Sequence, residues 1–139
     1  MIWIGIDPGV HTGIAIWDSE KEEFYELCTL PIHKAIIKVD NWWYDCKTMG
    51  TQMQLVFEDA RQRKWYTGNS DAKKQGAGSV KRDCTIWEDF CKDMGIPLQA
   101  VPPTKGMTKW TPEYFRMVIG WTGRTSEHAR DAAMLVFGR

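Results

Sequence analysis

The sequence lacks a long hydrophobic run, and no stretch of it approaches the roughly 20 apolar residues that a membrane-spanning helix needs. Its first ten residues, MIWIGIDPGV, contain no basic segment and reach an acid at Asp7, which is unlike a secretory signal peptide. The four cysteines include no C-x-x-C pair, so a zinc ribbon is not expected. We therefore expect reduced thiols in a cytoplasmic protein.

The sequence also lacks a net charge, since 18 basic residues balance 18 acidic ones. The charges are nevertheless segregated along the chain. Residues 61–82 carry seven basic residues against one acid, a net charge of +6, whereas residues 18–45 carry seven acids against three lysines, a net charge of −4. This segregation favours a basic face that binds nucleic acid, and a solvated loop leading into a solvated helix is the alternative.

The length of 139 residues, of which 43% are hydrophobic, fits one folded domain over residues 1–139 and is too apolar for a disordered chain. The hydrophobic pattern predicts a hairpin-led set of strands followed by alternating helices and strands, a mixed α/β architecture. The expected elements are strands at 1–7, 14–17 and 23–30, a helix near 32–49, a strand at 52–58, a long polar connection at 59–78, a helix near 79–94, a strand at 97–101, a short helix at 111–119 and a last helix from 126 to about 137.

Candidate catalytic residues stand at the ends of the predicted strands. Asp7 ends the first strand and Glu58 ends the fourth, and the carboxyl ends of neighbouring parallel strands meet at one edge of a sheet. His128 and Asp131 are three residues apart on the last helix, so they share one face. Three carboxylates and an imidazole in one place are costly to desolvate, and a divalent cation removes that cost. We therefore predict a site for Mg²⁺ or Mn²⁺, with one ion or two about 4 Å apart, able to cleave a phosphodiester.

Each of these residues also has a structural interpretation. Asp7 precedes a Pro-Gly turn, Glu58 can be a charged strand end, and Asp131 near a helix start favours the helix dipole. Strand alternation sends Asp59 to the face opposite Glu58, so Asp59 is only a weak further candidate. His11 in the first turn is expected to be structural.

The run Gly5-Ile6-Asp7-Pro8-Gly9, followed by Thr12-Gly13-Ile14-Ala15, resembles the opening of RuvC-type Holliday junction resolvases in the RNase H-like superfamily. Further matches are Val56-Phe57-Glu58, Gly76-Ala77-Gly78 and the ending His128-x-x-Asp131-Ala132-Ala133. The resemblance covers nearly the whole chain. It implies an RNase H-like mixed sheet flanked by helices, a homodimer, two Mg²⁺ or Mn²⁺ ions and paired nicks in a four-way DNA junction. Because cellular RuvC chains are longer, it also implies a compact phage or mobile-element variant in the cytoplasm of a bacterial or phage-infected cell.

The resemblance also implies roles for individual residues. Asp7, Glu58 and Asp131 correspond to the metal-binding carboxylates of the family. His128 corresponds to the histidine that many of these enzymes place three residues before the final aspartate, where it binds a metal or orients the attacking water.

The resemblance places basic residues near the scissile phosphate at Lys105 and Lys109. One departure concerns the aromatic residue that the family often carries three positions after the glutamate of the fourth strand, because Arg61 stands there. Trp65 and Tyr66 either take over stacking on a junction base or pack the loop. The expected DNA contacts are Arg61, Arg63, Lys64, Trp65, Tyr66, Lys73, Lys74, Lys81, Arg82, Lys105 and Lys109.

These observations predict a metal-dependent, structure-selective DNA endonuclease that resolves four-way junctions. Sugar-kinase and actin-like ATPases share a strand ending in Asp followed by Gly and Thr, but they need two such domains, which 139 residues cannot supply. Two alternatives stay open. One is a related nuclease that acts on other branched DNA or on structured RNA, including ribosomal RNA, and the other is a non-catalytic junction-binding protein.

Overall fold

A mixed five-stranded sheet forms the centre of the protein. The computed structural model describes residues 1–63, 71–103 and 109–139, and for residues 71–74 it describes the backbone alone. The strand order is β3-β2-β1-β4-β5. Strands β1, β2 and β3 pair antiparallel, and β4 and β5 continue the sheet parallel to β1. The strands are β1 (Ile2–Asp7), β2 (His11–Asp18), β3 (Glu23–Pro31), β4 (Met53–Glu58) and β5 (Leu98–Val101).

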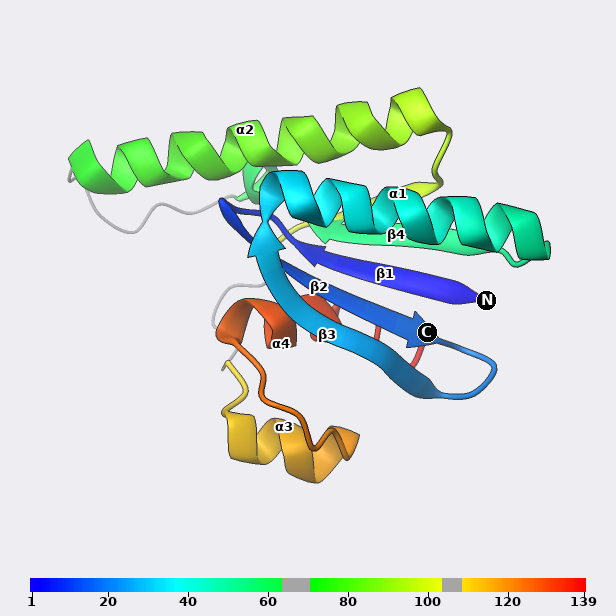
Figure 1. Ribbon diagram of the computed structural model, residues 1–139. Coiled ribbons are helices and arrows are strands. Elements are labelled where there is room, and N and C mark those ends of the chain that lie inside the picture. Colours follow the sequence, from blue (N-terminus) through cyan, green and yellow to red (C-terminus); the bar gives the residue numbers. More distant parts are fainter. Residues whose placement is uncertain (64–70, 104–108) are drawn as a thin grey trace.

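Helices cover both faces of this sheet (Figure 1). On one face lie α1 and α2, and on the other lie α3 and α4. The helices are α1 (Ile32–Met49), α2 (Asp71–Met94), α3 (Pro112–Ile119) and α4 (Glu127–Met134), with a short 3₁₀ turn, η1 (Ala60–Gln62), after β4. None of the helices within the described ranges is long and apolar enough to cross a membrane.

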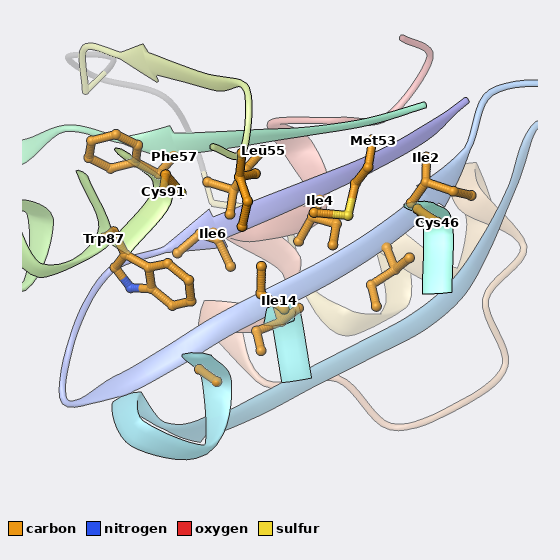
Figure 2. Close-up of a cluster of buried hydrophobic side chains, with 14 of the residues drawn as sticks. Ile2, Ile4, Ile6, Ile14, Cys46, Met53, Leu55, Phe57, Trp87 and Cys91 are labelled. Carbon is orange, nitrogen blue, oxygen red and sulfur yellow. The ribbon is translucent and has the colours of Figure 1, made fainter. Parts of the chain in front are cut away.

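Alternation along β1 separates the two faces. Ile2, Ile4 and Ile6 point toward α1 and α2 and are fully or nearly fully buried. Figure 2 shows Ile6 near Trp87 and Cys91 of α2, and Ile2 near Cys46 of α1 at the other end of the cluster. Because successive side chains of a strand point to opposite faces, Asp7 belongs to the other face, the one that α4 covers.

The α4 face is built from small residues and large aromatic ones. Ala129, Ala132, Ala133 and Val136 are buried and form a cluster with sheet residues such as Trp17. The small alanines let the helix lie close to the sheet, so that its first turn reaches the edge where β1 ends.

The mixed α/β fold and its element order are confirmed, and three boundaries differ clearly from the sequence prediction. The polar connection was expected to run to residue 78, but α2 already begins at Asp71. Gly76 and Gly78 weaken the helical pattern of this first part of α2, which is why the sequence did not predict it. The helix tolerates both glycines because Trp87 and Cys91 anchor it further along. The last helix ends at Met134, before the expected 137, and turns continue to Gly138.

The second strand begins at His11, earlier than the expected residue 14. The antiparallel ladder extends that far because Asp7 pairs with Gly13 on one side and His11 pairs with Pro31 on the other. All four cysteines are free thiols, and burial raises the pKa of Cys91 to about 12.

Candidate active site

Asp7 and Glu58 emerge side by side at one edge of the sheet. Strands β1 and β4 are parallel, and Ile6 pairs with Phe57, so the next residues along, Asp7 and Glu58, are at matching positions. Both point to the α4 face, opposite the buried Ile6 and Phe57. The sequence prediction that these two carboxylates share an edge is therefore supported by the register of the strands.

The first turn of α4 lies at the same edge. The Ser126 hydroxyl caps the helix by accepting a hydrogen bond from the backbone N–H of Ala129 at 3.0 Å, and it also bonds to the Thr29 hydroxyl of β3. The cap fixes where the helix begins, and the bond to β3 ties that start to the sheet. His128 and Asp131 are thus held over the ends of the strands.

Two glycines let the α4 backbone rest directly on the sheet. A Cβ atom on Gly13 of β2 would lie 2.0 Å from the carbonyl oxygen of His128, and one on Gly5 of β1 would lie 2.1 Å from that of Ala132. Any side chain at either position would push the helix away. The glycines of the motifs around Asp7 therefore also set the distance between His128 and the strands.

His128 and Asp7 are joined directly. The Nδ1 atom of His128 lies 2.7 Å from Oδ2 of Asp7, and the Asp7 side chain is 18% exposed. Burial raises the pKa of Asp7 above its ordinary value, more than the hydrogen bond and the charge of His128 lower it, and the charge of Asp131 raises it further. Ionisation of Asp7 is therefore less favourable than that of an exposed aspartate, even with its histidine partner.

Asp131 faces a lysine. The Nζ atom of Lys109 lies 3.0 Å from Oδ2 of Asp131 and also pairs with the carboxylate of Glu127. Burial alone would lower the pKa of Lys109, but the two carboxylates raise it to about 12. The sequence analysis did not single out Glu127. Its position four residues before Asp131, on the same helical face, was the available signal.

Glu58 completes the cluster. Burial raises its pKa, and the negative charges of Asp7 and Asp131 raise it further, while Arg63 and Lys109 lower it. Glu58 and Asp7 end neighbouring parallel strands, His128 bonds to Asp7, and Asp131 lies one turn further along α4. The structure therefore brings the four predicted catalytic residues and Lys109 to one edge of the sheet.

The donor set of this cluster fits a divalent cation. Carboxylate oxygens with one imidazole suit Mg²⁺ or Mn²⁺. Burial, and to a smaller extent neighbouring negative charge, raises the pKa values of Asp7 and Glu58, and a bound cation would offset both effects. Among the described residues, no three His, Cys, Asp or Glu side chains already stand in a metal-binding arrangement. Asp7 instead contacts His128, and Asp131 contacts Lys109.

Arg61 and Asp59 belong to a different contact. Arg61 Nε lies 2.8 Å from Asp59 Oδ1, and Arg61 Nη1 lies 2.7 Å from Glu88 Oε2 on α2. Burial would raise the pKa of Asp59, but hydrogen bonds from Arg61 and Gln62 lower it. Asp59 therefore takes no part in the carboxylate cluster. The Arg61 side chain already has two acidic partners, and its expected role in DNA binding stays a prediction.

The other predicted DNA contacts are only partly described. Arg63, Lys81 and Arg82 are exposed, and the N-terminal part of α2 projects beyond the sheet at the end where β1 and β4 finish (Figure 1). The remaining ones lie outside the described residues or have undescribed side chains: Lys64, Trp65, Tyr66, Lys73, Lys74 and Lys105. Their roles stay predictions.

Comparison with known proteins identifies the fold. No protein-family model and no curated protein sequence matches this chain. A solved structure of RuvC from T. thermophilus, in complex with a Holliday junction substrate, is similar to it with a TM-score of 0.60 and 14% sequence identity. The match covers 99% of this chain and 92% of the RuvC chain. The protein therefore has a RuvC-like fold of the RNase H type.

Proposed function

We propose that this protein is a Mg²⁺- or Mn²⁺-dependent endonuclease that nicks four-way DNA junctions. The proposal is supported by Asp7 and Glu58 at matching ends of two parallel strands, with His128 bonded to Asp7 and Asp131 one turn further along α4, in a RuvC-like fold. The carboxyl ends of strands are where ligand sites occur in α/β sheets. The solved RuvC structure with a junction substrate supports branched DNA as the class of substrate.

Each residue of the cluster would have its own role in phosphodiester hydrolysis. Asp7, Glu58 and Asp131 would hold the cation, which supplies Lewis-acid stabilisation of the phosphate and activates water. Asp7 accepts the hydrogen bond of His128 Nδ1 and so orients the ring. The other ring nitrogen of His128 is then available to take a proton from the attacking water or to bind the cation.

Lys109 and the basic segment contribute positive charge. Lys109, which contacts Asp131, would stabilise charge on the scissile phosphate. Arg63, Lys81 and Arg82 are exposed, and they would contact phosphates of the bound DNA. Such phosphate contacts would hold the DNA without reading its sequence.

A homodimer is part of the proposal, because one cluster nicks one strand. Resolution of a junction requires nicks in two strands, and a symmetric pair of protomers presents two equivalent clusters to a symmetric substrate.

The experiment is a cleavage assay with Mg²⁺ or Mn²⁺ on four-way, three-way, flap and linear duplex DNA and on a structured RNA. We expect paired nicks on the four-way junction, abolished by Asp7→Asn, with junction binding retained in Ca²⁺. Asp45→Asn, which removes an exposed carboxylate of α1, is the matched control and should cleave normally. Preferred cleavage of another substrate would reassign the substrate class, and junction binding without cleavage by the wild type would indicate a binding protein.

A further inference from the structure

The ammonium group of Lys109 lies at the carboxylate cluster. It contacts Asp131 at 3.0 Å and pairs with Glu127 one turn earlier on α4. Asp131 is one turn along α4 from His128, which bonds to Asp7, so the ammonium lies at the same edge of the sheet as the cluster. A divalent cation that binds Asp131 must share this carboxylate with an ammonium or displace it.

The backbone beside Lys109 is anchored independently of that side chain. Arg130 of α4 is 8% exposed and has carbonyl partners, since Nε donates to the carbonyl oxygen of Trp110 at 2.8 Å and Nη1 donates to that of Thr125 at 2.8 Å. A buried guanidinium thus ties the residue after Lys109 to the helix that carries Asp131. The Lys109 side chain is 57% exposed, so its ammonium can swing away from Asp131 while the backbone stays in place.

We propose that Lys109 is a built-in counter-cation that competes with the divalent metal for Asp131 and is released toward the phosphate of the substrate when the metal binds. The inference rests on the proposed function, since it concerns the same metal site. It assigns Arg130 as the positioning residue that keeps Lys109 beside the site after release. Removal of Lys109 should then strengthen metal binding while it weakens catalysis, a combination that a simple phosphate-binding role does not produce.

The first test is the affinity for Mn²⁺ of the wild type and of Lys109→Met, measured by calorimetric titration without DNA. We expect Lys109→Met to bind Mn²⁺ on the order of two- to tenfold more tightly, the range expected when a partly exposed ion-pair competitor is removed. Lys38→Met is the matched control, because Lys38 pairs with Glu26 at 2.7 Å on the α1 side and its loss should leave the affinity unchanged.

The second test follows release of the amine in the unmodified protein. The acylation rate of Lys109, measured by peptide mass spectrometry, should rise when Mn²⁺ is added, because the displaced amine loses its contact with Asp131 and becomes more accessible to the reagent. The rate at Lys38 should stay constant. The rise should be absent in Asp7→Asn if that variant no longer binds Mn²⁺.

The outcomes separate the two proposals. If the wild type binds Mn²⁺ but Lys109→Met binds it equally or more weakly, or if the acylation rate of Lys109 does not respond, the competition is wrong and the metal site stands. If neither protein binds Mn²⁺, the metal-dependent function and the competition both fail. Tighter binding by Lys109→Met with slower nicking of the junction supports both.

Discussion

His128 Nδ1 lies 2.7 Å from Asp7 Oδ2, although 121 residues separate the two along the chain. The contact depends on α4 lying on a sheet that has no side chain beneath His128, since Gly13 occupies that place. The pair links the strand that begins the chain to the helix near its end. It also gives the imidazole a fixed orientation at the edge where the other carboxylates stand.

The first prediction concerns His128. His128→Ala should reduce the single-turnover rate of junction nicking by about 10²- to 10⁴-fold, because a positioned proton acceptor contributes that much to such reactions. Junction binding in Ca²⁺ should persist. His33→Ala removes an exposed histidine of α1 and should nick at the wild-type rate. A His128→Ala protein that nicks as fast as the wild type would remove His128 from the mechanism.

The second prediction concerns Glu58 and pH. The raised pKa of Glu58 means that folding favours its neutral form, so this stabilisation is complete below the ordinary value of 4.5 and is lost as pH rises through the folded-state pKa. Glu58→Gln is neutral at every pH. In EDTA at pH 7 its melting temperature should therefore exceed that of the wild type by a few degrees, and the difference should vanish below about pH 4.5.

The matched control for Glu58→Gln is Glu23→Gln, which changes an exposed carboxylate of β3 whose side chain is 55% exposed. It should leave the melting temperature nearly unchanged across the same pH range. With Mg²⁺ or Mn²⁺ added, the order should reverse for Glu58→Gln, because the wild type gains stability from the bound cation and the variant gains less. A lower melting temperature for Glu58→Gln at pH 7 in EDTA would contradict the electrostatic account of the cluster.

The third prediction concerns the close packing of α4 against the sheet at Gly13. Gly13→Ala should destabilise the fold by about 2–3 kcal/mol, because the added methyl group overlaps the His128 carbonyl and the helix must move. The shift should also weaken the His128–Asp7 contact and lower the nicking rate. Gly76→Ala on α2 is the control, since a Cβ there meets nothing and alanine favours a helix by up to about 1 kcal/mol. Chemical denaturation measures both, and equal stability of Gly13→Ala and wild type would refute the close seating.

The fourth prediction concerns the basic face. Junction binding in Ca²⁺ should weaken steeply with salt, and Arg63→Gln and Lys81→Gln should each reduce the slope of log Kd against log salt by about one. Lys34→Gln, on the exposed part of α1 in the acidic segment, should leave the slope unchanged. Fluorescence anisotropy over a range of salt concentrations measures the slopes. A flat salt response of the wild type would refute phosphate binding by this face.

The candidate site could be predicted in part because its positions follow from local patterns. Alternation along β1 sends Asp7 to the face opposite Ile6, and the fourth strand repeats that pattern at Glu58. The spacing of His128 and Asp131 places both on one side of a helix. These inferences need only the periods of strands and helices together with the rule that parallel strands end at one edge.

Other features depended on contacts between distant segments. The pairing of Arg61 with Glu88 follows from how η1 packs against α2, which no local pattern encodes. The pairing of Lys109 with Glu127 likewise depends on the path of the chain before α3. The early start of α2 was hidden because its glycines weaken the helical pattern, while packing later in the helix sustains it.

The sequence by itself determined most of the strands and helices and which neighbouring residues share a face, because side-chain alternation and helical spacing are properties of neighbouring residues. Only the tertiary structure decided which charges meet. Asp7 takes His128 as its partner, and Asp131 takes Lys109, because α4 rests on Gly5 and Gly13 and Arg130 ties the segment beside Lys109 to that helix. The strength of an electrostatic contact depends on distances in space, and those distances are set by the packing of elements far apart along the chain.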